Sequence, residues 1–547
     1  MLARLWVVCW LALSAVSLFA QPACPSAAAW ASCDFAFDLE PNEDPARVEL
    51  RAEFRSPRHR TYMMHAFRDG DRRFVMRFSP TETGLWIYRI TSNLPRLDGK
   101  EVQFNVAESE SPGFVRVANV HHFAWEGTNK AHLWMATAID QFVTIPRADF
   151  DRTLEQRVKE EFTHLRVTLD RGIDLREAAE RIRAINAKGL VVDIVLSSIP
   201  EDWKEREQYV TDVAARFSGM NITWVGLPSF ENARGRVALK EAGALLKKLD
   251  AYNHPRTTLA SITSAPLLGD DWMNLIAYGT PDPNIGAVEH QLYQLPAINT
   301  GIQNVNDLWT ATMNGQYPAS GTGTYMTAWF DFMSGNRYWE LEPYFDVDGG
   351  RALALEGVEY IVYVEKPGLV EVTLEKHGYD VAWINPLNGE STKQKGYNGE
   401  HFTGEPPDKS HAWVLHISRE GTKEGMLKSW KFESRHVPVQ EIEQNPAKTP
   451  FEVDVPKDGD ISISHPPYYA LKVKRETRGT RSLLVEWMGE VPIDGEGYRV
   501  VGVGREGTMQ IPKTIARNYP AVMSLRVAVL NANGKAYFVD KVYRLVP

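Results

Sequence analysis

Two alternating runs flank a turn in residues 75–93, which read Val-Met-Arg-Phe-Ser-Pro-Thr-Glu-Thr-Gly-Leu-Trp-Ile-Tyr-Arg-Ile-Thr-Ser-Asn. Phe78 precedes the turn at 79–84, and Trp86 and Tyr88 follow it two residues apart. Because successive side chains of a strand point to opposite faces, these rings fall on one face of a half-buried sheet, and the arginines beside them point elsewhere. The pattern predicts a β-hairpin within a β-sandwich.

The length and net charge of the chain limit the number of domains and the kinds of ligand that we expect. At 547 residues it exceeds a single domain, which usually has ~100–200 residues, or ~250 for a barrel, so we expect three or four domains. Hydrophobic residues make up 44% and charged residues 24%, which is ordinary for globular protein. The net charge of −9 predicts no basic face for nucleic acid, and it suits a carbohydrate or another neutral ligand better.

The first 20 residues have the pattern of a cleaved secretory signal peptide. Arg4 precedes an apolar run at 5–13, and the small residue Ala20 stands before Gln21. A single membrane anchor is the alternative, although the run is short for a span of ~20 residues, and no later segment is long and apolar enough to cross a bilayer. We therefore expect a secreted, periplasmic or cell-surface protein.

Two cysteines remain after this cleavage. Cys24 and Cys33 are close in sequence, and an oxidising compartment would join them in a disulfide. Neither has metal-ligand spacing with another Cys or His.

The composition changes along the chain in a way that predicts five segments. After the signal peptide at 1–20, short alternating strands predict a β-sandwich at 34–108. From residue 132, strands alternate with amphipathic helices. We expect helices at 152–162, 175–188, 203–217 and 238–249, and strands at 132–137, 163–169, 190–196, 222–227, 257–262 and 275–278.

Apolar runs between helices are typical of a parallel sheet buried on both faces. They predict a (β/α)₈ TIM-type barrel at 113–340. An open doubly wound sheet is the alternative, but no Gly-x-Gly-x-x-Gly follows the first strand. The helical pattern stops after Gly335, and strands expected at 358–364, 370–374, 380–384 and 412–417 predict a β-sandwich at 341–436. A final all-β stretch at 450–547 looks like a fibronectin-type-III-like module.

A family resemblance rests on the turn at 67–71, Phe-Arg-Asp-Gly-Asp, and on the strand that follows, Arg-Phe-x-Pro-x-x-x-Gly-x-Trp-x-Tyr at 77–88. This sequence motif resembles the N-terminal immunoglobulin-like domain that precedes apiosidase-like glycoside hydrolase barrels in secreted bacterial proteins. Residues 113–125 resemble the lead-in to the barrel of that family. Residues 341–436 resemble its C-terminal β-sandwich, which is often named as a collagen-binding domain. The resemblance covers roughly residues 40–430 and implies a carbohydrate substrate or ligand.

The expected chemistry needs two carboxyl groups at the carboxyl ends of barrel strands, ~5–5.5 Å apart in retaining glycosidases and ~6.5–9.5 Å apart in inverting ones. Glu231 follows the fourth strand, where the family has its acid/base Glu. The family places a nucleophile near the end of strand seven, as Pro-x-x-Asn-x-Glu, and here Gly301 stands at the acidic position of the run 296–301. The first strand also departs from the family, since Ala136 replaces an aspartate.

Other side chains complete the predicted site. Glu289 is the candidate for the second carboxylate, with a solvated helix residue as its alternative role. Candidates for substrate binding are strand-end acids, hydrogen-bonding side chains and aromatic rings that stack on sugars: Asp140, His290, Tyr293, Trp329 and Trp339.

The sequence predicts no metal ion and no cofactor. His121 and His122 are adjacent rather than one helical turn apart. Residues 321–324 lack the Lys of a phosphate-binding loop, and the run 346–350 lacks the remaining ligands of a calcium loop.

Three functions follow from these patterns. The leading hypothesis is a secreted glycoside-hydrolase-like protein that cleaves polysaccharide or its side chains by carboxylate acid/base chemistry. The alternative is a catalytically degenerate carbohydrate-binding protein that uses the barrel cleft for recognition. A third hypothesis is a structural surface protein with partner-binding β-domains.

Overall fold

The computed structural model describes most of the chain in two compact units, residues 1–109 and 110–547. The described residues are 24, 27–118, 120–227, 233–282, 285–421, 442–448, 451–462, 468–476, 482–490, 499–503, 506–510, 522–531 and 536–547. The predicted signal peptide at 1–20 lies outside them. Among the described helices, none combines the length and the apolar character of a membrane span.

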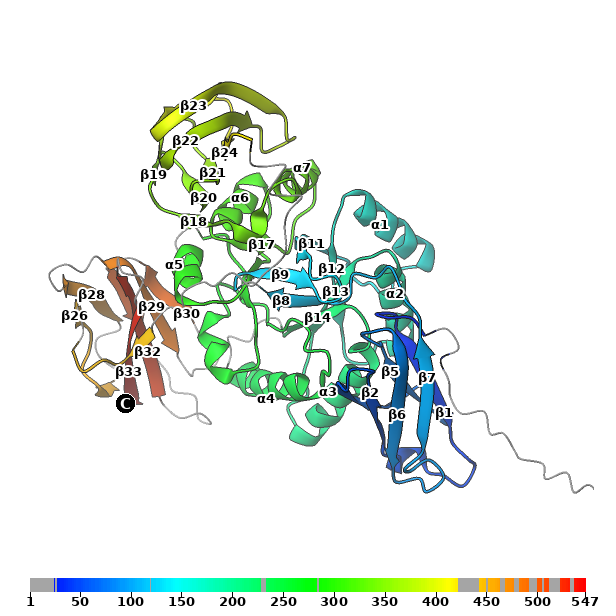
Figure 1. Cartoon of the computed structure of the whole chain (residues 1–547). Helices are drawn as coiled ribbons and strands as arrows, with labels where there is room; N and C mark the ends of the chain where they lie inside the picture. Colours follow the sequence, from blue (N-terminus) through cyan, green and yellow to red (C-terminus); the bar gives the residue numbers. More distant parts are fainter. Residues whose placement is uncertain are drawn as a thin grey trace, which may run out of the picture. The chain divides into compact units, whose positions relative to one another are not determined.

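The first unit contains two antiparallel sheets (Figure 1). Aromatic rings of the two sheets meet between them, as Phe35 and Phe54 do with centroids 5.4 Å apart. One sheet has the order β1 (Cys33–Asp38), β5 (Arg73–Phe78) and β4 (Phe67–Arg68). The other has the order β3 (Thr61–His65), β2 (Leu50–Arg55), β6 (Gly84–Ser92) and β7 (Glu101–Val106). A short 3-10 helix, η1 (Pro45–Arg47), precedes β2.

The predicted hairpin is wrong, because its two strands belong to different sheets. β5 pairs with β1 and β4, whereas β6 pairs with β2 and β7. The turn at 79–84 therefore carries the chain across the core, and the rings of Phe78 and Trp86 meet there with their centroids 5.2 Å apart. Gly84 has a φ of +114°, which favours glycine. Trp86 and Tyr88 are fully buried, as their spacing predicted.

Arg77 points away from the face of Phe78, as expected, but it is buried there. Its side chain is 4% exposed, and its Nε donates to Asp34 Oδ1 at 2.8 Å. Its guanidinium also lies 5.0 Å from the centroid of the Phe67 ring. A charge at this depth is tolerated because the carboxylate and the ring accompany it.

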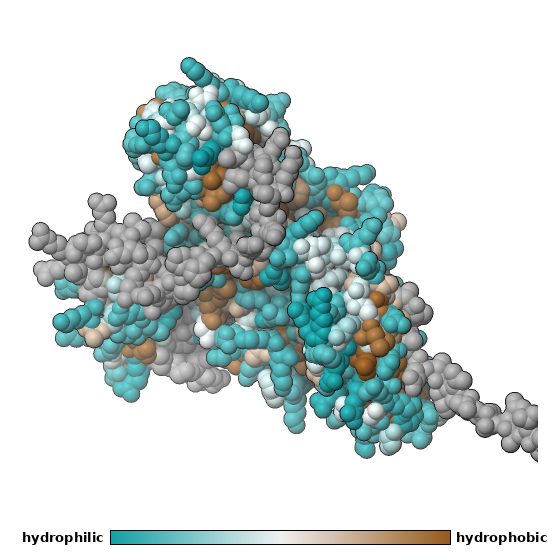
Figure 2. Space-filling view, in the orientation of Figure 1, coloured by the Kyte–Doolittle hydropathy of each residue, from teal (hydrophilic) through white to brown (hydrophobic). Residues whose placement is uncertain are grey.

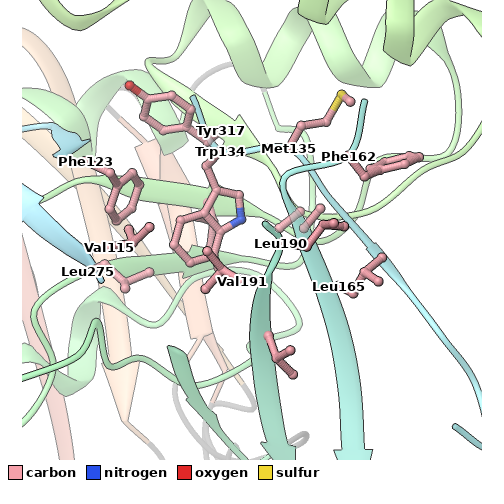
Figure 3. Close-up of a cluster of buried hydrophobic side chains, with 14 of the residues drawn as sticks. Val115, Phe123, Trp134, Met135, Phe162, Leu165, Leu190, Val191, Leu275 and Tyr317 are labelled. Carbon is pink, nitrogen blue, oxygen red and sulfur yellow. The ribbon is translucent and has the colours of Figure 1, made fainter. Parts of the chain in front are cut away.

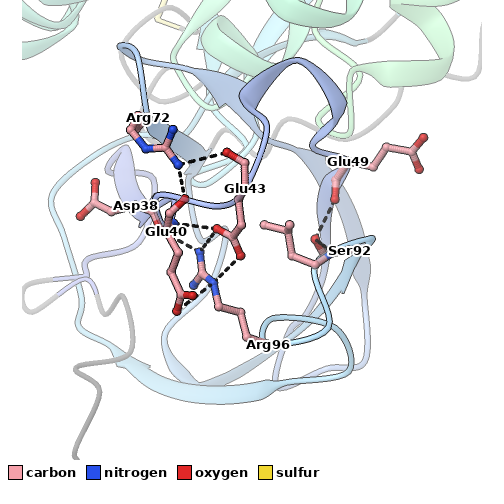
Figure 4. Close-up of polar contacts among 8 residues, drawn as sticks. Asp38, Glu40, Glu43, Glu49, Arg72, Ser92 and Arg96 are labelled. Atoms are coloured by element: carbon pink, nitrogen blue, oxygen red, sulfur yellow. Dashed lines mark hydrogen bonds and ion pairs between the residues drawn. The ribbon is translucent and has the colours of Figure 1, made fainter.

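A second arginine holds the long loop between β1 and β2 (Figure 4). Arg96 donates from Nε and Nη2 to the two carboxylate oxygens of Glu43, each at 2.7 Å, and Nη2 also reaches the carbonyl of Asp38 at 2.8 Å. The hydrogen bond from Arg96 lowers the pKa of Glu43. At the start of the unit Cys24 and Cys33 form a disulfide with Cα atoms 6.0 Å apart, which confirms the predicted pairing.

In its described residues the second unit contains two all-parallel sheets, one of four strands and one of three. The first sheet has the order β11 (Ala136–Ala138), β12 (His164–Leu169), β13 (Val191–Leu196) and β14 (Ile222–Gly226). The second has the order β15 (Ile276–Tyr278), β16 (Ala297–Asn299) and β17 (Gln316–Pro318).

Helices connect these strands. They are α1 (Arg147–Lys159), α2 (Leu175–Ala187), α3 (Trp203–Phe217), α4 (Ala233–Leu249), α5 (Ile285–Leu292), α6 (Val305–Met313) and α7 (Thr324–Ser334), with 3-10 helices η2 (Ala265–Asp270) and η3 (Tyr338–Glu340). Asp174 and Asp202 cap α2 and α3, because each side chain accepts hydrogen bonds from two N–H groups of the first turn. The predicted bounds of α3 are confirmed.

The strand predicted at 257–262 is absent from the described structure of that segment. A single bridge joins Trp224 to Arg256, and another joins Thr263 to Tyr278. The hydroxyl of Thr258 donates to the carbonyl of Leu227 at 2.7 Å, so a side chain provides a bond that a strand would make through its backbone.

The core of this unit joins the parallel strands to an antiparallel lead-in, β8 (Val115–Ala118), β9 (His122–Trp125) and β10 (Ala131–His132). Figure 3 shows Trp134 among apolar side chains from the lead-in and the strands. Its ring is fully buried and stacks on His164, with centroids 3.6 Å apart.

An antiparallel seven-stranded sheet follows α7. Its order is β18 (Glu342–Tyr344), β20 (Arg351–Leu355), β21 (Glu359–Val364), β24 (Trp413–Arg419), β22 (Val370–Ile384) and β19 (Val347–Asp348), and β23 (Ser391–Gly404) pairs with β22. The strands predicted at 370–374 and 380–384 are parts of β22. Register shifts after Thr373 and Tyr379 divide its pairing with β23, which explains the two separate patterns.

The described residues of the final stretch form two further sheets. One contains β25 (Ile442–Gln444), β33 (Ala536–Val546), β32 (Val522–Asn531), β29 (Ser482–Glu490) and β30 (Arg499–Val503), with β27 (Gly459–Ser462) on β33. The other contains β26 (Phe451–Asp454), β28 (Tyr468–Glu476) and β31 (Glu506–Gln510).

Candidate functional site

The carboxyl ends of the parallel strands are where the predicted carboxylates should gather. Asp140 lies two residues beyond β11 and is exposed. Arg166, on the neighbouring strand β12, donates to the carbonyl of Ala319 at 3.0 Å, just after β17. Burial lowers the pKa of Arg166, and the charges of Asp193 and Asp140 oppose that shift. The structure therefore places Asp140 beside a partly buried cation at the predicted edge.

A buried polar chain continues from this edge toward the start of the strands. Asp193 Oδ1 lies 2.7 Å from His164 Nδ1, and His164 Nε2 lies 2.7 Å from His132 Nε2. Burial and the neighbouring His164 hold the pKa of His132 well below its ordinary value. These three residues were not predicted to belong to a site, although polar side chains within apolar strands are a signal that the sequence contains.

The candidate proton donor, Glu231, lies outside the described residues, so its role remains a prediction. β14 ends at Gly226, five residues before it. Gly226 has a φ of +71°, and a Cβ atom there would lie 2.8 Å from the carbonyl oxygen of Thr257. The chain thus leaves β14 through a close backbone contact that requires glycine.

Gly301 occupies a closely packed position just beyond β16. Its N–H donates to Asn299 Oδ1 at 2.9 Å. A Cβ atom on Gly301 would lie 2.3 Å from the carbonyl oxygen of Gly279 and 2.7 Å from its carbonyl carbon. These are backbone atoms, which cannot rotate away, so the described geometry has no room for an acidic side chain at this position.

Glu289 is not a solvated helix residue, which was one of its two predicted roles. It lies on α5 with no exposed surface, and one of its carboxylate oxygens accepts a hydrogen bond from Thr263 Oγ1 at 2.6 Å. On the same helix Val288 and Leu292 pack against Ala528, Ala536 and Phe538. The catalytic role of Glu289 remains a prediction.

His290 and Tyr293, predicted to bind substrate, contact the turn between β8 and β9 and the strand β18, and their binding role remains a prediction. His290 Nε2 lies 2.5 Å from Glu342 Oε2, and His121 Nδ1 lies 3.1 Å from the same oxygen. The carbonyl of Tyr293 lies 3.0 Å from His121 Nε2. Because α5 returns the chain to the beginning of β16, this cluster lies toward the amino-terminal ends of the strands.

The cluster is dense in ionisable groups. The rings of His121 and His290 are 3.8 Å apart between centroids. Burial raises the pKa of Glu342, but hydrogen bonds from His121 and His290 outweigh it, and the net pKa is well below the ordinary value. Burial and the charge of His121 lower the pKa of His290. His122 is adjacent, with Nδ1 2.6 Å from the Tyr317 hydroxyl.

The two tryptophans predicted to stack on sugars are buried. Trp329, on α7, is 2% exposed and donates from Nε1 to Thr312 Oγ1 at 2.9 Å. Trp339, on η3, is 8% exposed and lies against Tyr338 with ring centroids 5.0 Å apart. Neither ring has an open face for a sugar, so burial gives these two predictions no support.

A cleft of about 370 Å³ lies on the C-terminal seven-stranded sheet. Phe345, which is 53% exposed, stands in its wall. Acidic, hydroxyl and imidazole groups share the lining: Asp346, Asp348, Glu371, Thr373, His401 and Thr403. An open aromatic ring among hydrogen-bonding groups is the composition that suits a sugar. On the face shown in Figure 2 the described surface is mainly hydrophilic, with separate hydrophobic patches.

Comparison with known proteins supports a glycoside-hydrolase-like fold. Residues 26–93 match the family model "Domain of unknown function (DUF5060)". No curated protein sequence matches the chain. A solved structure described as a glycoside hydrolase from Bacteroides vulgatus is 14% identical, covering 72% of this chain and 99% of that one, with a TM-score of 0.62. Another structure, named glycoside hydrolase, is 12% identical over 59% of this chain and 98% of that one, with a TM-score of 0.50. At these identities the likeness concerns the fold, and the chain has a multidomain, strand-rich, glycoside-hydrolase-like fold.

Proposed function

We propose that this protein is a secreted carbohydrate-binding protein built on a glycoside hydrolase fold, in which the retaining reaction has been lost. The proposal rests on the lack of room for a side chain at Gly301, where the resemblance to apiosidase-like proteins expects a nucleophile. A retaining glycosidase needs a second carboxylate at ~5–5.5 Å from the acid/base group. Secretion is part of the proposal, and the pattern at 1–20 and the disulfide of Cys24 and Cys33 support it.

The architecture of the proposed cleft is a (β/α)₈ barrel. The parallel pairing of β11 to β14 and of β15 to β17 supports it, with helices between successive strands. The parallel bridge between Trp224 and Arg256 supports a fifth position next to β14. In such a barrel Asp140, Arg166 and Glu231 would share the carboxyl-end face, where ligands bind.

Polysaccharide binding and hydrolysis should be measured on the same preparations. We expect the wild type to bind at least one member of a broad polysaccharide panel in affinity electrophoresis and to release no reducing sugar from it. Glu231→Gln should leave that outcome unchanged, because an amide of the same shape cannot donate a proton but can still hydrogen-bond a sugar. Glu289→Gln tests the second predicted carboxylate in the same way, and Glu155→Gln, exposed on α1, is the control.

Two results would overturn the proposal. If the wild type releases reducing sugar and Glu231→Gln abolishes the release, the protein is a hydrolase with Glu231 as its acid, and an inverting reaction becomes the favoured mechanism. If no polysaccharide binds, the carbohydrate-binding function is wrong and the structural-protein hypothesis is favoured.

A further inference from the structure

We infer that His121, His290 and Glu342 form a binding site for one divalent transition-metal ion, with zinc as the best match. Their ligand atoms all lie within 4.8 Å of one another. Two imidazole nitrogens and one carboxylate are a recurrent donor set for zinc. The residues come from three elements that are distant in sequence: the turn between β8 and β9, helix α5 and strand β18.

The distances between the ligand atoms fit a small metal ion if the side chains move slightly. Zinc bonds of ~2.0–2.1 Å in a tetrahedral arrangement put neighbouring ligand atoms about 3.3 Å apart. His121 Nδ1 lies 3.1 Å from Glu342 Oε2, which is close to that value. His290 Nε2 lies 2.5 Å from the same oxygen and would have to move by less than about 1 Å.

The orientation of the His121 ring gives an independent argument. Its Nε2 lies 3.0 Å from the carbonyl oxygen of Tyr293, which can only accept a hydrogen bond, so Nε2 is the donor in that contact. The contact turns Nδ1 toward Glu342 Oε2, 3.1 Å away, with the ring of His290 beside it. A metal ion bound by Nδ1 and by the carboxylate would bridge the two groups. A backbone carbonyl that fixes the second nitrogen is also the usual support for a metal-bound histidine.

The backbone before His121 is consistent with a site that fixes its side chain. Val120 has a φ of +63°, which is rare for a β-branched residue. Such a conformation is strained, and it persists where the surroundings require it. Here it carries the chain into the turn that presents His121 and His122 together. His122 Nε2 lies 4.0 Å from Glu342 Oε1, so His122 or a water molecule would complete the coordination.

The site lies toward the amino-terminal ends of the parallel strands, on the side opposite to the proposed sugar face. A metal there would join the lead-in to α5 and to the first strand of the C-terminal sheet. We therefore assign the metal a structural role. In a barrel-like fold the amino-terminal face contributes to stability, whereas catalysis takes place at the carboxyl-terminal face.

The test uses the exported full-length chain, stripped with a chelator and dialysed. Calorimetric titration with zinc should show one site per chain, and bound zinc should raise the thermal midpoint. Cobalt in place of zinc should give visible absorption bands of a tetrahedral site. His290→Gln and Glu342→Gln should each weaken zinc binding by about 100-fold or more, because losing even an outer partner of a metal ligand costs about 10- to 100-fold.

The matched control is His416→Gln. It also removes a buried histidine that bonds to a glutamate, since His416 Nε2 lies 2.7 Å from Glu359 Oε1, but among the described residues no third metal ligand lies beside that pair. It should keep wild-type zinc affinity. If the wild type takes up no zinc and added zinc does not change its thermal midpoint, the three side chains are joined by hydrogen bonds alone and the inference is wrong. Equal zinc uptake by the wild type and both cluster variants would also overturn it. These results are independent of any carbohydrate measurement.

Discussion

The carbonyl oxygen of Gly279 lies 2.3 Å from the place that a Cβ atom would take on Gly301. Gly279 is itself enclosed, since its own Cβ would lie 1.9 Å from the carbonyl oxygen of Ala260. Two backbone segments thus approach each other at the end of β16 as only glycines allow. The absence of a side chain at residue 301 is therefore part of the packing.

Gly301→Ala should destabilise the protein by about 1–3 kcal/mol, because the added methyl group forces the backbone apart. Gly301→Glu should be at least as destabilising and should release no reducing sugar. Denaturant unfolding and a reducing-sugar assay check both statements. Gly269→Ala is the control, because a Cβ atom there meets nothing within 4 Å. A stable Gly301→Glu protein with glycosidase activity would contradict the geometry.

The His132 side chain should make the protein less stable in mild acid. Its pKa is lowered in the folded state by burial and by His164, so the unfolded chain binds the proton more readily. Stability should therefore fall as the pH drops below the unfolded value of about 6.5, by up to about 1.4 kcal/mol per pH unit, the limit for one proton. Unfolding curves between pH 7 and pH 5 test this. His132→Gln should flatten the dependence, and His401→Gln on exposed β23 controls for the substitution itself.

Asp34→Asn should destabilise the first unit by about 2 kcal/mol. The substitution removes the charge beside the guanidinium of Arg77, whose side chain is 4% exposed, and leaving a buried charge without its partner costs more than breaking an exposed pair. Glu53→Gln is the matched control, because its partner Arg55 is 57% exposed, and it should cost less than about 0.5 kcal/mol. Equal effects of the two substitutions would show that the Arg77 pair contributes no more than a surface pair.

The exported protein should begin near Gln21 and have no free thiol. The third cysteine, Cys9, lies in the predicted signal peptide, and Cys24 and Cys33 are joined. N-terminal sequencing and a thiol assay on denatured, unreduced protein check this. Reduction should lower the stability of the first unit by about 2–3 kcal/mol, the value for a loop of this size. Two titratable thiols in the exported protein would contradict the expectation.

Phe345→Ala should weaken polysaccharide binding if the cleft on the C-terminal sheet takes part in it. The ring is 53% exposed, and losing its contact with a sugar should cost about tenfold in affinity, or about 1.4 kcal/mol. Leu369→Ala is the control, because Leu369 is equally exposed but does not line the cleft. Unchanged binding by Phe345→Ala would place recognition elsewhere on the protein.

Local patterns predicted many of the elements. The bounds of α3 follow from an apolar periodicity and from the Asp202 cap, and both act within a few residues. The burial of Trp86 and Tyr88 follows from their spacing. The partner of β6 did not follow, because a turn of the same sequence can join strands of one sheet or of two. The long-range pairing of β5 with β1 and of β6 with β2 and β7 decides between the two cases.

The sequence by itself determined the multidomain organisation, the alternation of apolar strands with helices, the disulfide and the absence of an acid at residue 301, since each depends on neighbouring residues or on spacing. Only the tertiary structure brought His121, His290 and Glu342 together, because Glu342 lies 52 residues from His290 and 221 from His121. It also buried Trp329 and Trp339, which by sequence were equally suited to a sugar site. Burial and convergence depend on how distant elements pack, and no local pattern contains that information.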